Sequence, residues 1–334
     1  MKRLKILVSV GLLGVLAWRT DWTQVAHAFA HLRLELWAAA VGAYLAAQLC
    51  SVVRWQQLSR PLGFHQPLRV FLGYYCIGMF FNLLLPTSVG GDVVRAWYLD
   101  DGSGRRLPAF VSVFVERCSG LLVLLLLACA AVLFSPQSLP AWVAWSVWTT
   151  AGLLLLGGLV VWFRCGAPDS VEAEDGTSSP GKLAVLRSAI STLRTALVEQ
   201  PGLLVTTTLL SVGVQAANVV LVWLVGLAIG APVPASYYWV AVPMVSLLMV
   251  VLPSLNGHGV REGGLVLFLA EVGVPAGTAL TLAFLWFSVM AAVSLAGGLV
   301  YLFGRFPRPE VRADHESLSH HSYQGRARQP ATAA

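Results

Sequence analysis

The sequence has 334 residues, of which 57% are hydrophobic and only 11% are charged, against roughly 25% charged in an average soluble domain. The net charge of +6 does not indicate nucleic-acid binding, because the basic residues lie between apolar runs and in the C-terminal tail, as in cytoplasmic loops of membrane proteins. We therefore predict an all-α integral membrane protein without a soluble catalytic domain.

The first apolar run follows Lys2, Arg3 and Lys5, as in a secretory signal. The Ala-His-Ala triplet at residues 26–28 resembles a cleavage site, but it lies about ten residues beyond the apolar run, too far for cleavage. We predict a retained first span over residues 4–20.

Further full spans are predicted wherever an apolar run reaches the ~20 residues that cross a bilayer core. These runs cover residues 35–53, 109–134, 141–163, 203–230 and 278–303. Several tryptophans lie near their ends, which is typical of the membrane interface. The five cysteines lie in or beside apolar segments without a CxxC pair, so we expect packing residues and not disulfides or metal ligands.

Two other apolar stretches, residues 70–99 and 237–273, are interrupted by proline, glycine and polar residues. The first break contains Asn82, Pro86, Gly90, Gly91, Asp92 and Arg95, and the second contains Pro253, Asn256, Gly257, Gly259, Arg261 and Glu262. A break frees backbone N–H and C=O groups, which is tolerable in a membrane only where protein or water satisfies them. Neither stretch should be a simple lipid-facing helix.

The basic residues decide the topology. If both broken stretches crossed the membrane, the basic loops near residues 105 and 164–194 would lie outside. If each stretch is a re-entrant hairpin, these loops face the cytoplasm and only Arg19 and Arg33 lie in outer loops. The second arrangement obeys the positive-inside rule much better. We predict about eight transmembrane segments, two of them re-entrant, with both termini cytoplasmic.

The two breaks also resemble each other. Leu85-Pro86 to Arg95 matches Leu252-Pro253 to Arg261 with a one-residue gap. In the predicted topology the hairpins have opposite orientations, which is typical of inverted repeats with a binding site near the membrane midplane. The alternative is chance similarity between short motifs rich in proline and glycine.

The predicted transmembrane domain covers residues 1–304, and its one long loop covers residues 164–201. Within this loop, residues 182–199 carry leucine and isoleucine at alternating spacings of 3 and 4, which predicts an amphipathic helix. It would lie on the cytoplasmic leaflet or pack on a partner helix. We expect a disordered cytoplasmic tail over residues 305–334, where His320 and His321 lack companion metal ligands, and no cofactor.

Charged residues within apolar segments are expensive and usually functional. Besides those in the breaks, Glu116 and Arg117 lie inside a predicted span. Adjacent residues on a helix point about 100° apart, so Glu116 and Arg117 cannot easily pair with each other and need partners elsewhere. We expect Arg95 to pair with Glu116 and Asp92 with Arg117. These pairs could be purely structural. Alternatively, glycine turns followed by helix starts bearing Arg95 and Arg261 suit an anionic, phosphate-bearing headgroup.

The ordered motifs resemble the lysylphosphatidylglycerol synthase transmembrane family, a flippase-like domain. The resemblance runs from about residue 5 to residue 304 and rests on four segments: Arg54-Trp55, residues 82–95, Glu116-Arg117 and residues 253–262. By itself, the position of Arg54-Trp55 favours an interfacial anchor. The family implies a helical fold in a prokaryotic plasma membrane, and its bifunctional members move an aminoacylated phospholipid between leaflets.

Two functions follow as hypotheses. One is a translocase for a phospholipid or polyprenyl-phosphate-linked lipid, with the residues of both breaks and Glu116-Arg117 binding the headgroup. The other is a membrane enzyme or accessory subunit of envelope lipid synthesis, in which Glu116 or Asp92 acts as a base. The expected partner is a lipid with an anionic headgroup; we also consider an envelope-biosynthesis enzyme and a second copy of the chain.

Overall fold

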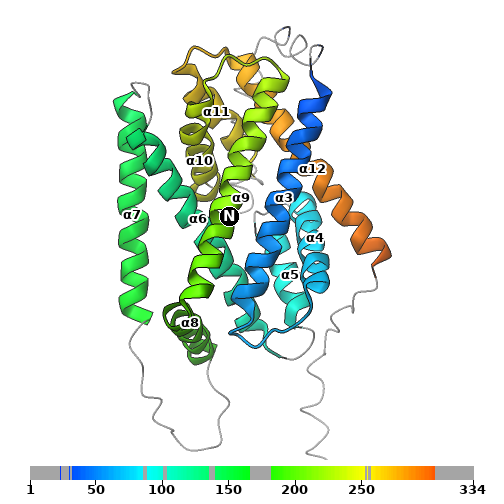
Figure 1. Cartoon of the computed structure of the whole chain (residues 1–334), viewed down its shortest axis with the longest axis vertical. Helices are drawn as coiled ribbons and strands as arrows, with labels where there is room; N and C mark the ends of the chain where they lie inside the picture. The colour runs from blue at the N-terminus through cyan, green and yellow to red at the C-terminus, as the bar shows by residue number, and fades with distance from the viewer. Residues whose placement is uncertain are drawn as a thin grey trace, which may run out of the picture.

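The computed structural model describes residues 23, 30, 32–85, 89–100, 104–134, 140–165, 182–252, 254 and 257–304. The regular elements in these ranges are all helices (Figure 1). They are α3 (Leu34–Ser59), α4 (Leu68–Leu84), α5 (Gly90–Asp100), α6 (Arg106–Phe134), α7 (Ala141–Cys165), α8 (Lys182–Glu199), α9 (Pro201–Ala228), α10 (Ala235–Val251), α11 (Val260–Ala270) and α12 (Ala276–Phe303). The predicted first span and the tail lie outside the described residues.

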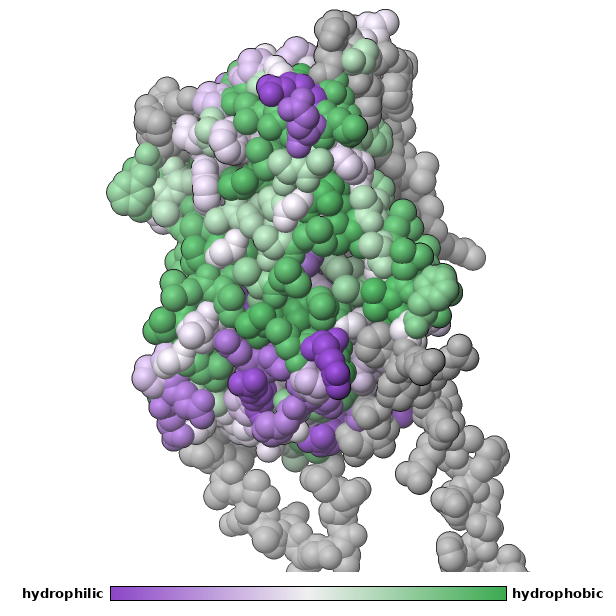
Figure 2. Space-filling model, turned by 45° about the vertical axis from the view of Figure 1, so that its right-hand side comes forward, coloured by the Kyte–Doolittle hydropathy of each residue, from purple (hydrophilic) through white to green (hydrophobic). Residues whose placement is uncertain are grey.

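Four of the described helices, α3, α6, α9 and α12, are long and apolar enough to cross a membrane. Each coincides with a predicted full span, and α7 begins at the predicted residue with a shorter apolar helix over residues 141–157. On the face drawn in Figure 2, a broad hydrophobic band is bordered by hydrophilic residues, most of them below it. This surface suits a bilayer, in which apolar side chains face lipid.

Each of the two broken stretches forms a pair of helices, both shorter than the four candidate spans. α4 and α10 have 17 residues each, and α5 and α11 have 11 residues each. At 1.5 Å per residue, an 11-residue helix covers about 17 Å, roughly half of a bilayer core. The predicted breaks are confirmed. In Figure 1, α4 and α5 lie in the lower half, at the end where α8 lies, while α10 and α11 lie in the upper half.

The helices before and after each pair repeat the same pattern. The series α3 to α6 has 26, 17, 11 and 29 residues, and the series α9 to α12 has 28, 17, 11 and 28 residues. The packing repeats as well. The second helix of each series packs on the last helix of the other series, α4 on α12 and α10 on α6, and the two first helices, α3 and α9, pack on each other. Each contact in one series therefore has a counterpart in the other.

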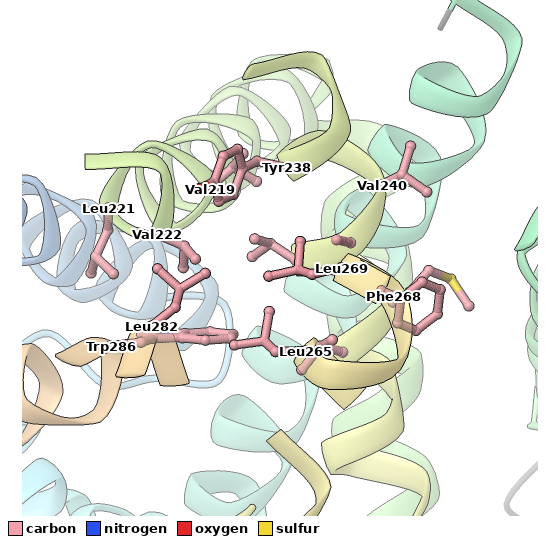
Figure 3. Packing of buried hydrophobic residues seen from close by; sticks show 14 of the residues in the cluster. Val219, Leu221, Val222, Tyr238, Val240, Leu265, Phe268, Leu269, Leu282 and Trp286 are labelled. Carbon is pink, nitrogen blue, oxygen red and sulfur yellow. The ribbon is translucent and has the colours of Figure 1, made fainter. Parts of the chain in front are cut away.

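The largest apolar core joins α9, α10, α11 and α12 and also takes in buried residues of α3, α6 and α7. Val222 of α9, Tyr238 of α10, Leu269 of α11 and Trp286 of α12 converge there (Figure 3). Further along α12, Gly297 packs directly on the backbone of Cys76 in α4, where a side chain would not fit. The core thus holds the pair α10–α11, the second hairpin, firmly. Small residues bring α12 against α4, which belongs to the pair α4–α5, the first hairpin.

The predicted amphipathic helix is α8, and part of its apolar stripe is buried within the molecule. Leu193 and Ala189 pack against Val111 of α6. Leu186 of the same stripe stays exposed. Packing on a neighbouring helix, one of the two predicted alternatives, therefore accounts for the buried part of the stripe.

Candidate functional site

A hydrogen bond between backbone and side chain joins the two helices of the first hairpin, α4 and α5, where the chain passes from one to the other. The N–H group of Gly91 donates to the side-chain oxygen of Asn82 over 2.7 Å, which links the start of α5 to the end of α4. A Cβ atom at Gly91 would overlap the carbonyl oxygen of Gly78, so the two helices approach closely because residue 91 is a glycine. This approach turns Asp92 and Arg95 towards α6.

Ion pairs then join α5 to α6. Arg95 Nη2 donates to Glu116 Oε2 over 2.9 Å. Arg117 holds Asp92 through two atoms, with 2.5 Å from Nε to Oδ2 and 3.0 Å from Nη2 to Oδ1. Both pairings expected from the sequence are confirmed. Arg95 Nε also lies 3.1 Å from Asp92 Oδ1, so the two pairs form one network.

A third arginine, Arg54 of α3, completes this network and was misjudged from the sequence. Its guanidinium donates to Glu116 Oε1 and, over 2.7 Å, to Ser211 Oγ of α9. Arg54 is 3% exposed and Trp55 is fully buried, so the interpretation of this dipeptide as an interfacial anchor was wrong. The predicted span ended at residue 53, whereas α3 continues to Ser59 and brings Arg54 into the helix bundle.

Aromatic rings flank the centre of the network. The guanidinium carbon of Arg95 lies 5.0 Å from the ring centroid of Trp55 and 4.9 Å from that of Tyr75. Trp55 is fixed in turn by a hydrogen bond from its indole N–H to Ser112 Oγ. Electrostatic interactions are strong in such surroundings because little water screens them.

The second hairpin carries a different arrangement. Gly257 and Gly259 have φ values of +80° and +85°, which only glycine adopts readily. Glu262 accepts a hydrogen bond from the N–H group of Gly259 over 2.6 Å and lies 2.6 Å from Arg261 Nη2. Arg261 and Glu262 are each 1% exposed. The start of α11 therefore already holds an anion, namely the side chain of Glu262.

The family model described as "Lysylphosphatidylglycerol synthase TM region" matches residues 3–298. The chain belongs to this family. Comparisons with curated proteins and with solved structures give no match. Together with the long apolar helices, membership makes the chain a multi-pass membrane protein of lipid biology.

Within the part of this family domain that the structure describes, the two hairpins keep separate charge clusters. The first cluster connects α3, α5 and α6, whereas the ion pairs of the second stay within α11 and the turn before it. Gly90 begins α5, while Pro86, Pro253 and Asn256 fall outside the described residues. His258 is 33% exposed and its Nδ1 lies 3.9 Å from Glu262 Oε1.

Proposed function

We propose that the protein is a translocase that moves a phospholipid or a polyprenyl-phosphate-linked lipid between the leaflets of a prokaryotic plasma membrane. The observation that carries this proposal is the buried ion-pair network at the half-depth hairpin α4–α5. A charged group in the apolar part of a membrane is retained where it serves a pathway for a polar or charged group. A phosphate headgroup that crosses the bilayer needs such a pathway.

The repeated helix pattern supports this proposal. In our interpretation, α3–α6 and α9–α12 are inverted repeats, each with a re-entrant hairpin, among six full spans with both termini cytoplasmic. Transporters built from inverted repeats bind substrate near the midplane, between broken helices. The matching lengths of the two series and their reciprocal packing are what this interpretation requires.

An enzymatic role has less support from the contacts. A general base needs a carboxylate that is free to accept a proton from substrate. Glu116 is held by Arg54 and Arg95, and Asp92 lies between Arg117 and Arg95. Carboxylates engaged in this way are poor bases. An accessory role beside an envelope-biosynthesis enzyme and a homodimer remain predictions.

Transport can be tested with purified protein in liposomes that carry a fluorescent phospholipid or polyprenyl phosphate. We expect the wild-type protein to speed equilibration between leaflets, and Arg95→Gln to slow it strongly, because the network loses its central guanidinium. Inverted repeats predict that Arg261→Gln slows it as well. Arg60→Gln, at the exposed end of α3, is the matched control and should transport like the wild type.

The outcome separates the hypotheses. If Arg261→Gln is silent and Arg95→Gln is inactive, then only the first hairpin handles the substrate. If wild-type protein moves none of the tested lipids, the translocase proposal is wrong, and the enzyme or accessory role takes its place.

The re-entrant topology predicts which positions share a side of the membrane. In a cysteine-free background, single cysteines at Ser103 and Ser191 should be protected from a membrane-impermeant thiol reagent in intact cells. A cysteine at Ala276, where α12 begins at the opposite end of the molecule, should be labelled. Labelling of Ser103→Cys from outside would make α4–α5 a crossing segment and remove the inverted-repeat interpretation.

A further inference from the structure

The ion-pair network of the first hairpin is not electrically balanced. Among the described residues it contains the guanidinium groups of Arg54, Arg95 and Arg117 and only the carboxylates of Asp92 and Glu116. One positive charge is therefore uncompensated. If these residues only neutralised one another, an equal number of each sign would be expected, because an unpaired charge is costly in a medium of low dielectric constant.

The members of the network differ sharply in exposure. The side chains of Arg95, Glu116 and Asp92 are 4%, 3% and 7% exposed, whereas that of Arg117 is 48% exposed. Arg117 lies 11 residues into the 29-residue α6, about 17 Å along a helix that is long and apolar enough to cross a membrane. Beside it, Phe114 is 68% exposed. Arg117 thus presents a cation on an apolar face of α6.

Asp92 has a second partner within reach. Arg95 Nε is buried and makes no hydrogen bond, although it lies only 3.1 Å from Asp92 Oδ1. A small rotation of the carboxylate would give Arg95 this bond. Asp92 can therefore release Arg117 and still keep a cation beside it, so Arg117 is the member of the network that can change partners.

On the basis of the proposed function, we propose that Arg117 binds the phosphodiester of the transported lipid, and that Asp92 occupies Arg117 while no lipid is bound. A guanidinium grips two phosphate oxygens as it grips the two oxygens of Asp92. A phosphodiester carries a single negative charge, which matches the single uncompensated charge of the network. Arg117 acts as the specificity residue for an anionic headgroup, and Asp92 competes with the substrate.

The transport assay tests this exchange through the amount of lipid that gives half of the maximal rate. With fluorescent phosphatidylglycerol, Asp92→Asn should lower this half-saturating amount severalfold, because the competing carboxylate is gone. Arg117→Lys should raise it about tenfold with little change in the maximal rate, since a lysine contact is not bidentate; a tenfold change corresponds to about 1.4 kcal/mol. Arg60→Gln should change neither quantity.

A purely structural role for the Asp92–Arg117 pair gives the opposite result. Asp92→Asn would then lower thermal stability and maximal rate for every lipid without lowering the half-saturating amount, and Arg117→Lys would leave that amount unchanged. Either result overturns the proposal. A fluorescent cationic lipid without phosphate provides the specificity control, because its movement should not improve in Asp92→Asn.

Binding can be measured without transport, which separates this inference from the proposed function. In detergent, short-chain phosphatidylglycerol should raise the unfolding temperature of the wild type and raise that of Arg117→Gln much less. Water-soluble glycerophosphoglycerol should have little effect. Equal stabilisation by the soluble compound would assign the site to a free phosphodiester, and equal stabilisation of both proteins by the lipid would exclude Arg117 as its ligand. If the wild type binds the lipid but moves none, only the translocase proposal fails.

Discussion

Glu116→Ala is expected to destabilise the protein by about 3–5 kcal/mol, the range found when one partner of a buried ion pair is removed. The carboxylate of Glu116 is 3% exposed and lies between the guanidinium groups of Arg54 and Arg95. Its removal would leave two buried cations facing each other in an apolar bundle. Chemical or thermal unfolding in detergent measures the effect.

The control for this substitution is Glu271→Ala. The carboxylate of Glu271 accepts a hydrogen bond from Trp142 at an exposed position, so its removal should change stability little. Glu116→Gln should fall between wild type and Glu116→Ala, since the amide keeps one acceptor but no charge.

A double substitution shows whether the loss comes from unpaired charge. In Arg54→Ala with Glu116→Ala, one of the two stranded cations is removed, and Arg95 keeps Asp92 as a partner. The double variant should therefore be more stable than the sum of the two single effects predicts. Strict additivity would mean that Arg54 and Glu116 are not coupled, and that Arg54 does not belong to the network.

The sequence predicted the framework of this site because its signals are local. Pro86 and Pro253 interrupt apolar runs of helical length, and the structure ends α4 and α10 at Leu84 and Val251. The 100° separation of neighbouring residues on a helix argued against a pair between Glu116 and Arg117, and the charged residues of the first break were the partners we expected for them. Each of these inferences depends on local sequence patterns and on which charged residues lie within apolar segments.

Two features were missed, one because it depends on tertiary structure and the other because it depends on the geometry of a helix start. Arg54 looks like an end residue because it follows the apolar run, and only the packing of α3 against α6 and α9 shows that it is buried. Arg261 and Glu262 are neighbours, yet they pair, because Glu262 turns back towards Gly259 at the start of α11. The first turn of a helix offers free N–H groups, and these draw the carboxylate to where Arg261 can reach it.

Gly91→Ala is the second substitution for which we expect a large effect. The added methyl group would overlap the carbonyl oxygen of Gly78 and lie 2.7 Å from the side-chain carbon of Asn82. Neither neighbour can move alone, since one is helix backbone and the other holds the N–H group of residue 91. The helices α4 and α5 must separate, and overpacking of this kind costs about 1–3 kcal/mol.

Gly213→Ala in α9 is the matched control, because a methyl group there meets no atom within 4 Å. Alanine favours a helix over glycine by about 1 kcal/mol, so this variant should be as stable as wild type or slightly more stable. Unfolding temperatures in detergent compare the two variants directly.

The proposed transport activity should be more sensitive to this substitution than stability is. Since α5 carries Asp92 and Arg95, separation of α4 and α5 would also shift these residues relative to Glu116 and Arg117 on α6. Gly91→Ala should therefore slow lipid movement even at temperatures where the variant remains folded, while Gly213→Ala should not. A folded Gly91→Ala variant with the wild-type rate would show that the close contact of α4 and α5 does not position the network, and that the ion pairs to α6 suffice to do so.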